Sequence, residues 1–163
     1  MSLKVVNIDI LKLDVEAVVN AANVDLKEGG GICGQIFKKA GRDKLKKSCD
    51  KLAPIKPGDA VLTDGFDLKQ AYIIHVVGPI YNEMYKEACR SILKNAYKSV
   101  LNICKAKNIK SVAFPLISAG IYGYPEKEAF MVAKSTIDEF LKEYDMEVYL
   151  STLGKNILSL IMA

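Results

Sequence analysis

Two glycine-centred loops contain the residues whose types and spacing are best suited to binding a ligand. The first runs from Asn20 to Gly34 and holds three consecutive glycines, and the second runs from Pro115 to Pro125. Each loop follows an apolar, strand-like run and leads into a segment with helical spacing. Glycine lets a ligand approach the main chain closely, and a helix N-terminus offers unpaired N–H groups and a partial positive charge. Together the two loops are predicted to bind a diphosphate from both sides.

Other catalytic and nucleotide-binding patterns do not fit these loops. Neither loop is a G-x-G-x-x-G motif, and neither ends in the Gly-Lys-Ser/Thr of a P-loop. His75 lies inside an apolar strand-like run, and we interpret it as a hydrogen-bonded core residue rather than a catalytic base. Ser118 lacks the G-x-S-x-G elbow of a hydrolase nucleophile. Covalent catalysis is therefore not expected.

The four cysteines indicate neither zinc nor disulfides. Cys33, Cys49, Cys89 and Cys104 form no C-x-x-C pair, and the chain has a single histidine. No metal and no cofactor are predicted, and the cysteines are expected to be reduced thiols that pack as small apolar groups. Cys33 has a second interpretation, because a helix begins there and a helix N-terminus can lower the pKa of a thiol and make it reactive.

Composition and charge exclude several classes of partner. The chain has 163 residues, with 23 basic and 19 acidic side chains and a net charge of +4. The lysines are spread along helical segments and form no basic stripe interleaved with aromatic residues, so a nucleic-acid partner is not predicted. No apolar run approaches the ~20 residues of a membrane span. Without a recognisable secretion signal, a cytoplasmic location is expected.

These residues must be positioned by alternating strands and helices. Strands are predicted at 4–8, 17–20, 60–63, 71–77, 111–115 and 146–153, and helices at 36–52, 84–106 and 126–144, with a short terminal helix from about 155. This order predicts an α/β fold, a three-layer α/β/α sandwich with a central mixed, largely parallel sheet. In such a fold ligands bind beyond the carboxyl ends of the strands, where both glycine loops fall.

Four motifs, taken in order, resemble those of macrodomains. They are Val-Val-Asn20-Ala-Ala-Asn23, the three glycines six residues later, His75-Val-Val-Gly78-Pro79 and the second loop from Pro115 to Gly123. Macrodomains are ADP-ribose-binding modules, a family that includes ADP-ribosyl hydrolases and O-acetyl-ADP-ribose deacetylases. The resemblance runs from about Val5 to the C-terminus, and it implies a single macrodomain over residues 1–163.

The resemblance also implies a role for each residue that matches a family motif. Asp9, followed by Ile10, would accept a hydrogen bond from the adenine amino group and so discriminate against guanine. Asn23 would hydrogen-bond the distal ribose, while Asn20 would brace the loop by bonding nearby backbone. Tyr122 would pack over the distal ribose. The other implied ligand-binding residues are Gly29, Gly30, Gly31 and Ile32 in the first loop, Ser118, Ala119, Gly120 and Ile121 in the second, and Leu153 as a wall against adenine.

The sequence departs from the best-known hydrolase branch at two positions. In that branch the glycines are followed by Val-Asp-Gly, with a histidine four residues beyond the aspartate, whereas this chain has Cys33 and Phe37 there. Some hydrolytically active macrodomains also lack the aspartate and are thought to use water held by the ligand's phosphate and the loop asparagine. Asn23 is then the candidate catalytic residue. A second branch uses a lysine and an aspartate that this chain lacks at the matching positions.

Two functions of different class follow from the resemblance. The first is a hydrolase that cleaves an ester at the distal ribose, in a mono-ADP-ribosylated acidic side chain or in O-acetyl-ADP-ribose. The second is a reader that binds ADP-ribose or mono-ADP-ribosylated proteins without turnover. The residues at positions 33 and 37 favour the reader, whereas a free-standing domain favours the hydrolase, which is the preferred hypothesis.

Overall fold

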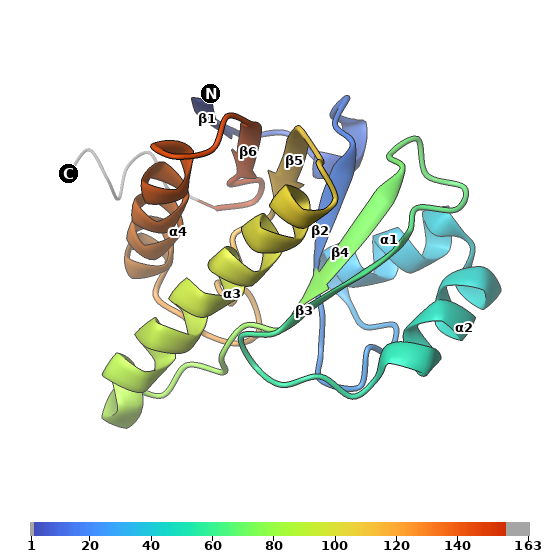
Figure 1. Cartoon of the computed structure of the whole chain (residues 1–163). Helices are drawn as coiled ribbons and strands as arrows, with labels where there is room; N and C mark the ends of the chain where they lie inside the picture. The colour runs from blue at the N-terminus through green and yellow to red at the C-terminus, as the bar shows by residue number, and fades with distance from the viewer. Residues whose placement is uncertain (1, 156–163) are drawn as a thin grey trace.

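A computed structural model describes residues 2–155, and its centre is one six-stranded sheet (Figure 1). The strands are β1 (Ser2–Val6), β2 (Ala17–Ala21), β3 (Ala60–Asp64), β4 (Tyr72–Val76), β5 (Ser111–Phe114) and β6 (Glu147–Ser151). Their order in the sheet is β1-β6-β5-β2-β4-β3. Every neighbouring pair is parallel except β3 and β4, which are antiparallel. The predicted mixed, largely parallel sheet is therefore confirmed.

Helices cover both faces of this sheet and complete the three predicted layers. The α-helices are α1 (Gly31–Ala40), α2 (Arg42–Leu52), α3 (Lys86–Ala106) and α4 (Glu126–Leu141), and two short 3₁₀ turns are η1 (Ile10–Lys12) and η2 (Glu83–Tyr85). The helices α3 and α4 lie on one side of the sheet, and α1 and α2 lie on the other (Figure 1). Within the described residues, no helix is both long enough and apolar enough to cross a membrane.

The alternating direction of side chains along the central strands explains why helices cover both faces of the sheet. Val19 and Ile74 pack with residues of α3 and α4, whereas their chain neighbours Val18 and Ile73 pack with residues of α1 and α2. Successive side chains of a strand point to opposite faces, and all four of these side chains are fully buried. Apolar residues at consecutive positions therefore require a helical layer on each side, as parallel sheets usually have.

The single helix predicted over residues 36–52 is wrong, because the chain forms two helices there. Gly41 separates them with φ 105° and ψ 103°, a conformation that favours glycine. Its N–H donates to Phe37 O (3.1 Å) and ends α1, while its carbonyl accepts from Leu45 N (3.0 Å) and starts α2. The first helix also begins earlier than predicted, directly after Gly30.

Other boundaries differ by a few residues. The strand β1 covers 2–6 rather than 4–8, because the chain then turns into η1. The third α-helix begins at Lys86, after the turn η2, rather than at position 84. The terminal helix predicted from about position 155 lies outside the described residues.

The sheet order brings four distant chain segments to one edge. The strands β1, β6, β5 and β2 are adjacent and mutually parallel, so their carboxyl ends share an edge. Asp9 follows β1, Leu153 follows β6, and the two glycine loops follow β2 and β5. The fold therefore collects the predicted ligand-binding segments at the place where this architecture binds ligands.

Candidate functional site

A cavity of about 730 Å³ opens at this edge, and almost all of the predicted site residues line it. Twelve of the thirteen do so: Asp9, Ile10, Asn23, Gly29, Gly30, Gly31, Ile32, Ser118, Gly120, Ile121, Tyr122 and Leu153. Ala119 does not line the cavity, because it is buried within the second loop and its carbonyl oxygen accepts a hydrogen bond from Lys155. The cavity volume is within the range of small-molecule binding sites.

The first loop presents open main-chain donors at the start of α1. Gly34 N donates to Gly30 O (3.3 Å), but in the described part of the chain the N–H groups of Gly31, Ile32 and Cys33 have no backbone or side-chain acceptor. Gly34 must be glycine, since a Cβ there would lie 2.7 Å from Gly29 O. Open N–H groups at a helix N-terminus form a site for an anion.

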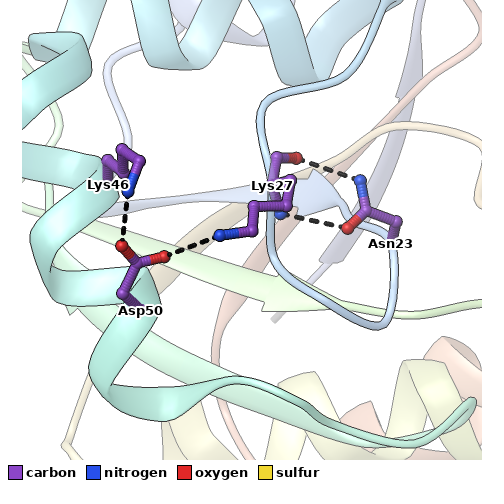
Figure 2. A network of polar contacts seen from close by, with 4 residues as sticks. All are labelled: Asn23, Lys27, Lys46 and Asp50. Carbon is purple, nitrogen blue, oxygen red and sulfur yellow. Dashed lines mark hydrogen bonds and ion pairs between the residues drawn. The ribbon is translucent and has the colours of Figure 1, made fainter.

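Asn23 lies on the cavity wall. Its side chain also holds the first loop in shape through the hydrogen bonds drawn in Figure 2. Its Oδ1 accepts from Lys27 N (3.0 Å) and its Nδ2 donates to Lys27 O (3.0 Å). The side chain of Lys27 then pairs with Asp50 of α2 (3.3 Å), which also pairs with Lys46 (2.7 Å). The amide of Asn23 is thus fixed in orientation, and each of its two polar groups retains capacity for one further hydrogen bond.

Asn20 braces the site in a different way from the one predicted. It lies opposite His75 in the pairing of β2 with β4 and is 1% exposed. Its Nδ2 lies 3.0 Å from His75 Nδ1 and 3.7 Å from Cys33 Sγ. The predicted bonds to nearby backbone are therefore replaced by contacts with buried side chains, and it is Asn23 that bonds the local backbone.

His75 is confirmed as a hydrogen-bonded core residue. Burial lowers the pKa of His75 to about 4, so the ring is neutral at pH 7. Since Nδ1 accepts from Asn20, Nε2 carries the proton and donates to Thr63 Oγ1 (2.9 Å). Thr63 in turn donates to the carbonyl of Asp64 (3.2 Å). Both ring nitrogens are occupied, and the ring does not line the cavity.

Cys33 lines the cavity but is not an activated thiol. Burial raises the pKa of the Cys33 thiol, and hydrogen bonds from the Gly29 backbone and Asn20 oppose this only in part. The reactive interpretation is therefore wrong at neutral pH, because desolvation of the thiolate outweighs these two hydrogen bonds. All four cysteines are buried and free.

The second loop presents another set of open donors. Ser118 adopts a positive φ of 67°, and its Oγ donates to Pro79 O (2.8 Å). Tyr124 N donates to Ser118 O (2.9 Å), which closes the loop. Within the described residues, no acceptor is present for the N–H groups of Ser118, Gly120, Ile121 and Tyr122. Successive open N–H groups in a tight turn form an anion-binding nest.

The opposite end of the site is built around Asp9 and Leu153. One carboxylate oxygen of Asp9 accepts from Leu11 N (3.0 Å) and caps η1. The other oxygen has no partner among the described residues and is available to a ligand. The side chain of Leu153 is 54% exposed, so it offers an apolar surface to a flat ring.

The sequence analysis missed Lys155 as a site residue. Lys155 and Asp9 are the charged residues among those that line the described cavity. The ammonium of Lys155 donates to Ala119 O (3.0 Å), and it lies 3.8 Å from Glu126 Oε2 at the start of α4. Its position two residues after Leu153 was visible in the sequence, but the contact with the second loop depends on tertiary structure.

Similarity to known proteins shows the family to which this chain belongs. The model of the Macro domain matches residues 19–133, most of the chain. The chain belongs to the macrodomain family. It is 45% identical over 140 residues to the human protein named ADP-ribose glycohydrolase MACROD2. The matched residues make up 86% of this chain and 33% of that protein. This macrodomain thus spans about a third of the length of that relative.

Solved structures with the same fold include complexes with nucleotides. An Oceanobacillus iheyensis macrodomain with ADP has a TM-score of 0.91 and 36% identity over 98% of this chain and 87% of that one. A Trypanosoma brucei macrodomain with ADP-ribose has a TM-score of 0.82 and 29% identity over 91% of this chain and 63% of that one. Structures of the Oceanobacillus protein also include single substitutions at an asparagine, at a glycine seven residues later and at an aspartate three residues after that glycine.

Proposed function

We propose that this macrodomain binds ADP-ribose and hydrolyses an ester at its distal ribose. The observation that carries the proposal is a single cavity bordered by two sets of open N–H groups, at the start of α1 and in the second loop, with an available carboxylate oxygen of Asp9 at its other end. Open main-chain donors suit a diphosphate. An unpaired carboxylate oxygen suits the amino group of adenine.

Relatives support both parts of the proposal. Macrodomains of similar fold are complexed with ADP and with ADP-ribose, and the human relative is named as an ADP-ribose glycohydrolase. In the Oceanobacillus protein the substituted asparagine, glycine and aspartate have the same spacing as Asn23, Gly30 and Cys33. We therefore align Cys33 with that aspartate.

The chemistry at position 33 decides what kind of hydrolysis is possible. Because the pKa of the buried Cys33 thiol is raised, the thiol is protonated at neutral pH and cannot accept a proton from water. Phe37 is buried and apolar. Asn23, whose amide is held by Lys27, retains a lone pair and an N–H with which to orient water. Catalysis would then depend on positioning the water against the ester beside the ligand's phosphate.

A reader without turnover is the second candidate, and it is favoured by the same two residues. A site with Cys33 and Phe37 has no side chain there that can act as a general base. Such a site would bind ADP-ribose or a mono-ADP-ribosylated protein through the open N–H groups alone. The two candidates differ only in turnover, so a kinetic experiment separates them.

Binding and turnover are measured on the same protein. ADP-ribose should bind by calorimetry much more tightly than AMP, which lacks the second phosphate and the distal ribose. A glutamate-linked mono-ADP-ribosylated protein and O-acetyl-ADP-ribose then serve as substrates. Equal affinities for the two nucleotides would contradict the two-loop site. Binding of ADP-ribose without turnover of either ester would show that the protein is a reader rather than a hydrolase.

The variant Asn23→Ala tests the proposed catalytic role. Turnover should fall by roughly ten- to a hundredfold or more, as expected when a positioning contact is lost, and affinity for ADP-ribose should fall less. Lys27→Met is the matched control, because it keeps the backbone that holds Asn23 and removes only the pairing with Asp50. Cys33→Ser should be nearly silent. A large loss of rate in Cys33→Ser with binding intact would favour thiolate catalysis instead.

A further inference from the structure

Lys155 connects two segments that border the cavity with the start of α4. It follows the adenine-side residue Leu153, its ammonium donates to Ala119 O of the second loop (3.0 Å), and it faces Glu126 of α4 (3.8 Å). The side chain is 24% exposed, so the contact is shielded from most of the solvent. Among the described residues that line the cavity, no other side chain is cationic.

The contact with Ala119 acts on a main-chain donor of the proposed diphosphate site. The carbonyl of Ala119 and the N–H of Gly120 belong to one planar peptide group, so a bond that fixes the carbonyl also fixes the direction of the N–H. Gly120 lines the cavity, and its N–H has no acceptor in the described structure. A cation on the carbonyl also polarises the peptide group and strengthens its N–H as a donor.

We propose that Lys155 is a positioning residue for a diphosphate ligand. It fixes the orientation of the Ala119–Gly120 peptide group, and it supplies positive charge beside the second loop. The inference rests on the proposed binding of ADP-ribose. It assigns Lys155 to recognition of the phosphates rather than of the adenine ring, although Lys155 follows the adenine wall in sequence. Ala119 O accepts the hydrogen bond of the ammonium at 3.0 Å, whereas Glu126 Oε2 lies 3.8 Å from the ammonium, near the outer limit of an ion pair.

The test compares two ligands that differ in their phosphates. Calorimetry with ADP-ribose and with adenosine is carried out on the wild type, on Lys155→Met and on Lys155→Arg. ADP-ribose affinity should fall about tenfold in Lys155→Met, the size expected for one hydrogen bond to a charged group, while adenosine affinity stays unchanged. Lys155→Arg should recover part of the loss, and raising the salt concentration should weaken binding less in Lys155→Met than in the wild type.

A second lysine provides the matched control. Lys134→Met removes the same charge from α4, where Lys134 pairs with Asp138 on the exposed face (2.6 Å), and it should leave both affinities unchanged. Equal losses for ADP-ribose and adenosine in Lys155→Met would show a merely structural role and overturn the inference, as would no loss at all. Failure of the wild type to bind ADP-ribose would instead overturn the proposed function.

Discussion

At the scale of single residues, the polar side chains of the site have a structural task beside the proposed functional one. One oxygen of Asp9 caps η1, and both groups of the Asn23 amide bond Lys27. These local bonds fix the orientation of the side chains before any ligand arrives, which lowers the entropy lost on binding. Simple truncation of such a residue therefore removes two functions at once, and a matched variant is needed to separate them.

Asp9→Asn is the matched variant for base recognition. It keeps an oxygen to accept from Leu11 N but replaces the other oxygen with a donor, which is the wrong partner for an adenine amino group. Affinity for ADP should fall by about 1–3 kcal/mol, and the preference for ADP over GDP should narrow. Calorimetry with the two nucleotides measures both effects, and Asp9→Ala reports the added cost of losing the cap. An unchanged preference for ADP over GDP would show that Asp9 does not recognise the base.

At the scale of elements, Gly41 decides how the layer that covers one face of the sheet is built. The glycine ends α1 and starts α2 within one residue, through its N–H to Phe37 and its carbonyl from Leu45. Each helix can therefore turn its own buried side chains to the sheet, with Ile36 on α1 and Cys49 on α2. A continuous helix over this stretch could not align both sets on one face.

Gly41→Ala should destabilise the protein without involving the cavity. The backbone at φ 105° is strained for any residue with a Cβ, and the added atom would lie 3.2 Å from Asp67 Oδ2. The free energy of unfolding in urea should decrease by about 1–3 kcal/mol. Gly30→Ala is the control, since its φ is −85° and an added Cβ meets nothing within 4 Å. Equal stability of Gly41→Ala and the wild type would show that the break between the helices tolerates a side chain.

This break also illustrates what the sequence could and could not predict. Apolar spacing predicted the strands and the long helices because it reports which faces are buried. Gly41 gave no local sign that it would take a positive φ, because a lone glycine is also tolerated inside a helix. The buried contacts of Asn20 were likewise hidden, since they depend on the pairing of β2 with β4. The cavity residues were predictable because four motifs occur in order, whereas Lys155 reaches the site only through a tertiary contact.

At the scale of the whole molecule, a neutral histidine lies in the interior of the sheet. His75 is fully buried in β4 and hydrogen-bonded on both ring nitrogens. The folded protein therefore favours the uncharged ring, and the unfolded chain binds a proton more readily. Folding and protonation are linked through this one residue.

The pKa of His75 predicts how stability depends on pH. It is lowered from 6.5 to about 4, so the stabilising effect is complete above about pH 6.5 and is lost as the pH falls toward 4. The loss should reach roughly 3 kcal/mol by pH 4. Urea unfolding at intervals between pH 7 and 4 measures it, and the part of this window above about pH 5.5 reports the single histidine most directly, because the 19 acidic side chains titrate closer to pH 4. His75→Gln should be less stable but should show little change over the same range; an equal slope in that variant would exclude His75 as the cause.

The pairing of β1 with β6 has a consequence for the time at which the site forms during synthesis. Strand β1 lies at the edge of the sheet and pairs only with β6 among the described strands, although it is made first and β6 is made last. Asp9 therefore leaves the ribosome long before Leu153, which lines the same cavity. A growing chain can complete the sheet interior between β2 and β4 while its first strand still has no neighbour. On the proposed function, a nascent chain should gain no stability from a nucleotide until β6 has been released, and truncation of β6 should remove both the edge pairing and the proposed adenine side together.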